Sequence, residues 1–154
     1  MRILLIDDSR KHREAGVTDL VALGHEVVAL GNYTDVAKTV REQKFDAALL
    51  DLLMPSEPMM LGGEGLSHLG EPFAVGYPLA VYLAMKGVPL VAVATDANHH
   101  NHPASAMMDW LCKESVTVNG CSVTFMHSPM KQIGDVWVKD WPAVLTQAGI
   151  RGKP

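Results

Sequence analysis

The stretch ILLIDD at residues 3–8 is an aliphatic run that stops at two adjacent acids, and ALLD at residues 48–51 repeats that pattern. Apolar runs without alternation are typical of strands that are covered on both faces, as in a parallel sheet. The carboxyl ends of parallel strands open onto the same edge of a sheet, so the acids that follow these runs are expected to lie close together. These two stretches therefore predict both the fold and the position of a site.

Strands and helices alternate along the rest of the chain. Further strands are predicted at 26–30 and 89–94, and Asn119-Gly120 predicts a hairpin between 116–118 and 122–126. Helices are predicted at 10–23, 34–43, 77–86, 103–114 and 140–148. This alternation predicts an α/β protein with a doubly wound parallel sheet and a hairpin near strand five. We expect the flavodoxin-like strand order 2-1-3-4-5, in which strands one and three are neighbours.

Residues 56–76 break this rhythm, because they are rich in Pro, Gly and Met and have no clean period. We interpret them as a long insertion after strand three, within a single domain that covers residues 1–154. Glu57, Glu64 and His68 are candidates for an added contact with the expected site. The alternative is a surface loop without chemistry.

Composition excludes several classes of protein. The chain is 48% hydrophobic and 19% charged, which is typical of a globular domain, and its net charge of −4 gives no electrostatic reason to bind nucleic acid or an anionic membrane. Two cysteines are too few for a disulfide scaffold. No apolar stretch reaches the roughly 20 residues of a transmembrane helix. We expect a soluble, cytoplasmic protein.

Asp7, Asp8 and Asp51 are the acids at the two strand ends. Carboxylates that lie close together raise one another's pKa unless a cation intervenes, and Mg2+ prefers oxygen ligands. Such a metal can bring a phosphate to a carboxylate oxygen, and aspartate is a recognised covalent acceptor. A single Asp after a strand is more often a turn former or a helix cap. Two strand ends that point to one edge favour a metal or anion site.

With these segments the chain resembles the receiver domains of response regulators, the CheY-like proteins of two-component phosphorelays. The resemblance rests on residues 3–9, 48–55 and 91–95, which carry the acid pair, then Asp-x-x-Met-Pro, then an apolar strand that ends in Thr. It is specific over residues 1–55, fair over 77–95 and poor beyond.

The resemblance implies a role for each matched residue. Asp51 is the expected phosphoacceptor, and Asp8, Asp51 and the carbonyl of Leu53 are the expected Mg2+ ligands, with Asp7 acting mainly through water. Thr95 is expected to hydrogen-bond the phosphoryl group and to report its presence by moving. A histidine kinase is the expected source of the phosphate.

Receivers end strand five with Lys-Pro, and that lysine contacts the phosphoryl oxygens. Here strand five is followed by Ser128-Pro129, so the alignment places Ser128 at the lysine position. A rival alignment places Lys113 there, and Lys131 is a third candidate that reaches in from the next loop. Both alignments stay open at this point.

The loop at 96–102 is rich in histidine and adjoins the expected carboxylate site. Imidazole suits Zn, Ni and Cu, so a second metal site is a further hypothesis, with His99 and His102 as ligands joined by His68 or His127. The alternative is a solvated polar loop. His12 is interpreted as a surface residue of the first helix.

We therefore expect a stand-alone signalling module that accepts phosphate on Asp51 with Mg2+ and acts by binding a histidine kinase or another signalling protein. Enzymatic activity is expected to be limited to its own phosphorylation and dephosphorylation. One alternative is a pseudo-receiver that binds proteins without taking phosphate. Another is a metal-binding protein or metal-dependent enzyme that uses the loop at 96–102.

Overall fold

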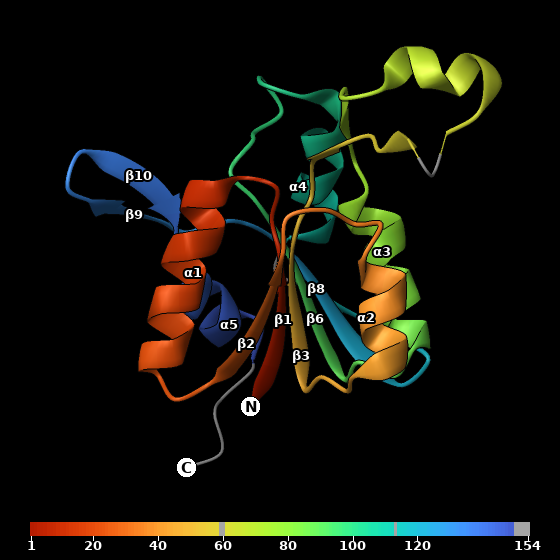
Figure 1. Ribbon diagram of the computed structural model, residues 1–154. Helices are drawn as coiled ribbons and strands as arrows, with labels where there is room; N and C mark the ends of the chain where they lie inside the picture. The colour runs from red at the N-terminus through yellow and green to blue at the C-terminus, as the bar shows by residue number, and fades with distance from the viewer. Residues whose placement is uncertain (59–60, 113, 150–154) are drawn as a thin grey trace.

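A six-stranded sheet forms the centre of the protein (Figure 1). The computed structural model describes residues 1–58, 61–112 and 114–149. In spatial order the strands are β2 (Glu26–Leu30), β1 (Arg2–Ile6), β3 (Ala47–Asp51), β6 (Leu90–Thr95), β8 (Cys121–His127) and β7 (Ser115–Val118). The first five are parallel, and β7 pairs with β8 in the antiparallel sense. The predicted order 2-1-3-4-5 and the hairpin at strand five are confirmed.

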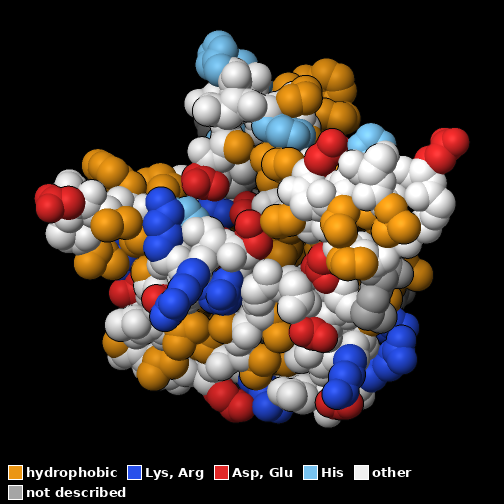
Figure 2. All heavy atoms as spheres, turned by 45° about the horizontal axis from the view of Figure 1, so that its top comes forward, with side chains coloured by type: hydrophobic (Ala, Val, Ile, Leu, Met, Phe, Trp, Pro, Cys, Tyr) orange, Lys and Arg blue, Asp and Glu red, His pale blue; other side chains and the backbone are white. Residues whose placement is uncertain are grey.

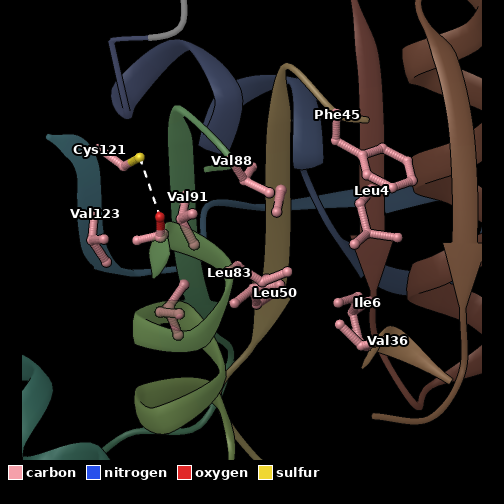
Figure 3. Close-up of a cluster of buried hydrophobic side chains, with 14 of the residues drawn as sticks. Leu4, Ile6, Val36, Phe45, Leu50, Leu83, Val88, Val91, Cys121 and Val123 are labelled. Atoms are coloured by element: carbon pink, nitrogen blue, oxygen red, sulfur yellow. Dashed lines mark hydrogen bonds between the residues drawn. The ribbon is translucent and has the colours of Figure 1, made fainter. Parts of the chain in front are cut away.

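Helices cover both faces of this sheet: α1 (Arg10–Ala22) and α5 (Trp141–Gln147) cover one, and α2 (Val36–Glu42), α3 (Gly76–Met85) and α4 (Met108–Leu111) cover the other. Successive side chains of a strand point to opposite faces. Leu4 and Ile6 therefore pack into the core beneath α2 and α3, which Figure 3 shows, whereas Ile3 and Leu5 pack beneath α1 and α5. Each aliphatic run serves two cores, which explains why it does not alternate.

The prediction of one continuous helix over residues 103–114 is wrong. The chain there forms a 3-10 helix at Pro103–Met107 and then the single turn of α4. Cys112, the next residue, already bridges to Phe125 at the edge of β8. The helix ends early because the chain must return to the sheet to begin β7.

A second two-stranded sheet follows β8. β9 (Met130–Ile133) and β10 (Val136–Lys139) pair in the antiparallel sense and project beside α1 (Figure 1, blue). The chain reaches α5 only after this hairpin. Asp140 then caps α5 as predicted, with its Oδ1 accepting from the N–H of Ala143 at 3.1 Å.

The insertion after strand three projects from the edge of the sheet where the parallel strands end (Figure 1). It holds a short antiparallel pair, β4 (Met54–Pro55) with β5 (Pro72–Phe73), and a 3-10 helix at Gly63–His68. The Glu57 carboxylate accepts from the backbone N–H groups of Tyr33 at 2.7 Å and Thr34 at 3.2 Å. Glu57 thus ties the insertion to the loop before α2.

Gly76, the first residue of α3, touches the end of β3. Its N–H donates to the carbonyl of Leu52 at 3.0 Å, and a Cβ at this position would lie 2.7 Å from the carbonyl oxygen of Asp51. Real Cβ atoms do not approach backbone so closely. The absence of a side chain therefore lets α3 begin directly against Asp51.

We expect Gly76→Ala to lower the free energy of unfolding by about 1–3 kcal/mol, because the added methyl overpacks a backbone contact. Urea unfolding followed by circular dichroism measures this loss. Gly65→Ala is the matched control, since its Cβ would meet nothing closer than 3.6 Å. Equal losses in the two variants would contradict the prediction.

Candidate functional site

The acids after the parallel strands gather at one edge of the sheet. Asp7 follows β1 and Asp51 ends β3, and these two strands are parallel neighbours. Asp7 and Asp51 are buried, whereas Asp8 is exposed. One carboxylate oxygen from each of the three lies within 4.8 Å of the others. Figure 2 shows acidic side chains on this face, between the β9–β10 hairpin and the insertion.

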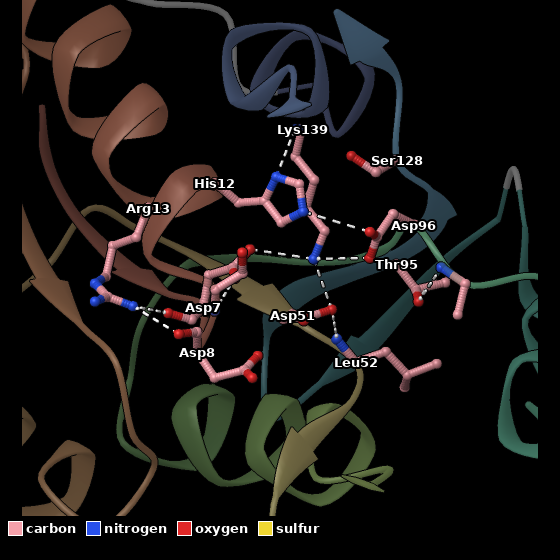
Figure 4. Close-up of polar contacts among 12 residues, drawn as sticks. Asp7, Asp8, His12, Arg13, Asp51, Leu52, Thr95, Asp96, Ser128 and Lys139 are labelled. Atoms are coloured by element: carbon pink, nitrogen blue, oxygen red, sulfur yellow. Dashed lines mark hydrogen bonds and ion pairs between the residues drawn. The ribbon is translucent and has the colours of Figure 1, made fainter. Parts of the chain in front are cut away.

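Lys139, the last residue of β10, lies among these acids (Figure 4). Its side chain is fully buried, and its Nζ lies 2.8 Å from Oδ1 of Asp51, 3.1 Å from Oδ2 of Asp7 and 3.5 Å from Oδ1 of Asp96. An ammonium group has three N–H donors, and here three carboxylates face it. A buried charge is tolerated only when it is paired in this way.

Lys139, and not Ser128, contacts the acids in the described part of the chain, so the contacts favour Lys139 over Ser128 for the expected lysine position. The hydroxyl of Ser128 donates to the carbonyl of Pro129 at 3.0 Å, and its N–H donates to the carbonyl of Thr95 at 2.8 Å. Lys139 is the last residue of the β9–β10 hairpin that follows strand five, so it comes later in the sequence than the alignment to Ser128 assumes.

The other two lysines considered do not change this assignment. Lys113 lies outside the described residues. Lys131, on β9, pairs with Asp19 of α1. Lys131 therefore holds the hairpin against α1 rather than reaching the acids.

The positive charge of Lys139 does not fully offset the burial of Asp51 and the negative charges around it. The pKa of the Asp51 carboxyl is raised to about 7, chiefly by burial and also by Asp7 and Asp96, while the Lys139 ammonium opposes this rise. Burial lowers the pKa of Lys139, but the carboxylates of Asp51, Asp7 and Asp96 outweigh burial and leave that pKa above its usual value. Burial and Asp7 also raise the pKa of Asp8. One lysine thus does not balance the acids, and a cation would stabilise their charged forms.

The three acids fit a Mg2+ ion, because they offer oxygen ligands alone. Within the described part of the chain, the exposed Asp8 carboxylate has no hydrogen bond or ion pair, so it is available to a metal. Oδ1 of Asp51 accepts from Lys139 and from the N–H of Leu52 at 2.7 Å, which leaves its Oδ2 for a ligand. The Leu53 carbonyl stays a predicted ligand.

Both carboxylate oxygens of Asp7 are already engaged. Oδ1 accepts from the N–H of Ser9 at 2.8 Å, and Oδ2 accepts from Lys139. The guanidinium of Arg13 donates to the carbonyls of Asp7 at 2.5 Å and Asp8 at 3.1 Å, which fixes the backbone between them. This arrangement agrees with the expectation that Asp7 reaches a metal through water.

Thr95 ends β6 beside this site and is buried. Its Oγ1 accepts from the N–H of Ala97 at 3.1 Å. Its role as a reporter of phosphate stays a prediction.

The four histidines of the second predicted metal site do not meet. His99 and His127 approach opposite oxygens of Asp109, at 3.3 Å and 2.9 Å. The hydrogen bond from His127 lowers the pKa of Asp109, and His99 lowers it further. These three residues form an exposed polar cluster. Within the described residues, Asp7, Asp8 and Asp51 are the one group whose ligand atoms all lie within 4.8 Å of one another.

His102 and His68 make separate local contacts. His102 caps the 3-10 helix at Pro103–Met107 by accepting from the N–H of Ala104 at 3.1 Å. His68 pairs with Glu71 in the insertion at 2.7 Å. The geometry therefore gives no support to a transition-metal site shared by the four histidines.

The prediction that His12 lies at the surface is wrong, because this side chain is buried at 3% exposure. It contacts Lys139 and Asp96, so the site contains three residues that the sequence patterns did not single out. The run VWVK at 136–139 did carry a signal, since it is another mostly apolar run that stops at a charged residue. No local pattern marks His12.

Comparison with known proteins identifies the fold. No protein-family model and no curated protein matches the chain in sequence. Among solved structures, it is similar to a response regulator from Burkholderia pseudomallei, with a TM-score of 0.55 and 16% identity over 96% of this chain and 65% of that one. The chain has the receiver-domain fold.

Two further structures agree. A response-regulator receiver domain from Clostridium thermocellum matches with a TM-score of 0.54 and 16% identity, covering 97% of this chain and 94% of that one. The receiver domain of the Francisella response regulator 1452 matches with a TM-score of 0.54 and 12% identity, covering 97% and 93%. The Burkholderia structure is described as containing a phosphorylated aspartic acid, a calcium ion and citrate. Among the described residues, no helix has the length and apolar character needed to span a membrane.

The raised pKa of Asp51 predicts that Mg2+ binding depends on pH. Below about pH 7 a proton occupies this carboxyl and competes with the metal, so Mg2+ affinity should fall by about tenfold per pH unit. Calorimetric titration from about pH 8 to about pH 5.5 measures this slope. Asp109→Asn, outside the site, should keep the slope and Asp51→Asn should flatten it. A flat profile for the unaltered protein contradicts the prediction.

Lys139→Met should destabilise the metal-free protein by about 3–5 kcal/mol at neutral pH, because it leaves buried carboxylates without their counter-charge. Mg2+ should restore part of this loss. Urea unfolding with and without Mg2+ measures both effects. Lys131→Met, which breaks the partly exposed pair with Asp19, is the matched control and should cost about 1 kcal/mol or less, with no rescue by Mg2+. A Lys139→Met variant as stable as this control would refute the argument.

Proposed function

We propose that this protein is a phosphoaccepting signalling module of the cytoplasm, which takes a phosphoryl group on Asp51 with Mg2+ and receives it from a histidine kinase. One observation carries the proposal. The Lys139 ammonium lies 2.8 Å from Asp51, and Asp51 belongs to a group of three carboxylates whose oxygens lie within 4.8 Å of one another. The Asp51 carboxylate is thereby flanked by a fixed positive charge and by a set of oxygen ligands.

The geometry supports a direct transfer to Asp51. Its Oδ2 has no hydrogen bond or ion pair among the described residues and is the expected nucleophile. It would form the new bond to phosphorus while the donor's leaving group takes the electrons of the bond that breaks. Lys139 lies close enough to donate to an oxygen of the transferred group. Bound Mg2+ would neutralise charge on the phosphoryl oxygens and would be held by Asp8 and Asp51.

The alternatives fit the geometry less well. A pseudo-receiver has no need for a buried lysine held among three acids, since burying these charges costs free energy that plain packing would avoid. An enzyme that uses a transition metal needs histidines that converge. His99 and His127 share Asp109, but His68 and His102 make separate contacts elsewhere. The phosphoacceptor function uses the residues that the fold brings together.

Incubation with acetyl phosphate and Mg2+ should add the mass of one phosphoryl group, measured by mass spectrometry of the intact protein. Asp51→Asn should abolish this addition, because an amide oxygen is a poor nucleophile. Asp109→Asn removes an exposed acid of the His99–His127 cluster and should leave the addition unchanged. An unmodified protein, or a modification that persists in Asp51→Asn, would rule out the proposed function.

A further inference from the structure

The backbone of Lys139 lies outside the main sheet. The parallel ladder ends at His127, and Lys139 belongs to the separate β9–β10 hairpin, where it pairs with Met130. The position of the lysine relative to Asp51 is therefore not fixed by the strand pairing that fixes the acids. Some other contact must align the hairpin with the sheet at this point.

His12, on α1, makes that contact through the backbone of Lys139. Its Nδ1 accepts from the N–H of Lys139 at 3.1 Å, and the imidazole is buried (Figure 4). An Nδ1 atom that accepts from a backbone N–H carries no proton, so the proton of the neutral ring lies on Nε2. The hydrogen bond thus selects one tautomer of His12.

The Nε2 atom points to Asp96, at 3.4 Å from its Oδ2. The hydrogen bond from His12 holds the pKa of Asp96 well below its usual range, so this carboxylate is charged at neutral pH. The other oxygen of Asp96 lies 3.5 Å from Nζ of Lys139. A closed ring results, in which His12 holds the backbone of Lys139 directly and its ammonium through Asp96.

We propose that His12 is a positioning residue for Lys139, which aims the lysine ammonium at the phosphoryl group on Asp51 through the Lys139 N–H and through Asp96. This inference rests on the proposed function, since it names a residue that serves the same site. The ring joins three segments: α1, the end of β10 and the loop after β6. Breaking it should weaken the hold of Lys139 on a phosphoryl group without removing any metal ligand.

Fluoroberyllate with Mg2+ is the probe, because it mimics a phosphoryl group on a carboxylate, and fluorine NMR measures its affinity. His12→Ala should weaken fluoroberyllate binding by roughly tenfold, the effect of losing about one hydrogen bond to a charged group. Within the described residues His12 contacts Lys139 and Asp96 and none of the expected metal ligands, so Mg2+ affinity measured alone should stay within about twofold. Retained Mg2+ binding also shows that the variant is folded.

A double-mutant cycle separates positioning from general packing. If His12 acts through Lys139, then His12→Ala should have no further effect on fluoroberyllate binding in a Lys139→Met background. His12→Asn, which keeps a side-chain acceptor near the Lys139 N–H and lacks the donor to Asp96, should bind with an affinity between those of the unaltered protein and His12→Ala. Should His12→Ala fail to fold, His12→Asn takes its place in the cycle.

The outcomes are distinct. Unchanged fluoroberyllate affinity in the His12 variants, or a loss of equal size in the Lys139→Met background, overturns the positioning role while the phosphoacceptor function stands. A failure of the unaltered protein to bind fluoroberyllate with Mg2+ overturns the proposed function, and the positioning role with it.

Discussion

Carboxylates held side by side by neighbouring parallel strands repel one another, and the rest of the site must supply positive charge to offset this repulsion. β1 and β3 end at the same edge of the sheet, so their terminal acids have no freedom to separate. Burial makes the conflict stronger, because water no longer screens it. Lys139 relieves part of the conflict by placing one ammonium against three carboxylates. The remaining negative charge explains why the site suits a divalent cation.

The lysine and the acids are supplied by different parts of the fold, and α1 joins them. The sheet supplies Asp7 and Asp51, whereas the β9–β10 hairpin supplies Lys139. α1 contacts the hairpin at two levels, through the Asp19 pair with β9 and through His12 at the end of β10. The same helix follows Asp7 and Asp8 in the chain, and its Arg13 fixes their backbone. A helix that covers one face of the sheet thereby aligns both halves of the site.

The sequence predicted the part of the site that depends on local pattern. An aliphatic run that stops at an acid is visible within six residues at 3–8, and the parallel topology then brings the acids together without further information. Lys139 was not predictable in this way, because the inserted hairpin moves it away from the end of strand five. His12 and Lys139 are 127 residues apart in the sequence, and a single histidine on a helix gives no indication of so distant a partner. The early end of α4 has a similar origin, since it depends on the bridge between Cys112 and Phe125.

The three acids are alike in sequence, but their surroundings give them different parts. Both carboxylate oxygens of Asp7 accept hydrogen bonds, one from the N–H of Ser9 and one from Lys139. Asp7 therefore organises the site and is poorly placed to bind a ligand directly. Asp8 is exposed and faces the solvent from which a cation arrives. Asp51 is intermediate: Lys139 and the N–H of Leu52 hold one of its oxygens, and the other has no partner among the described residues. Because the pKa of Asp51 is raised, its charge depends on a nearby cation. Without a cation, a proton competes for the carboxyl, whereas a bound cation would favour the charged form. Under the proposed function, burial of this one side chain would therefore couple metal binding to phosphate acceptance.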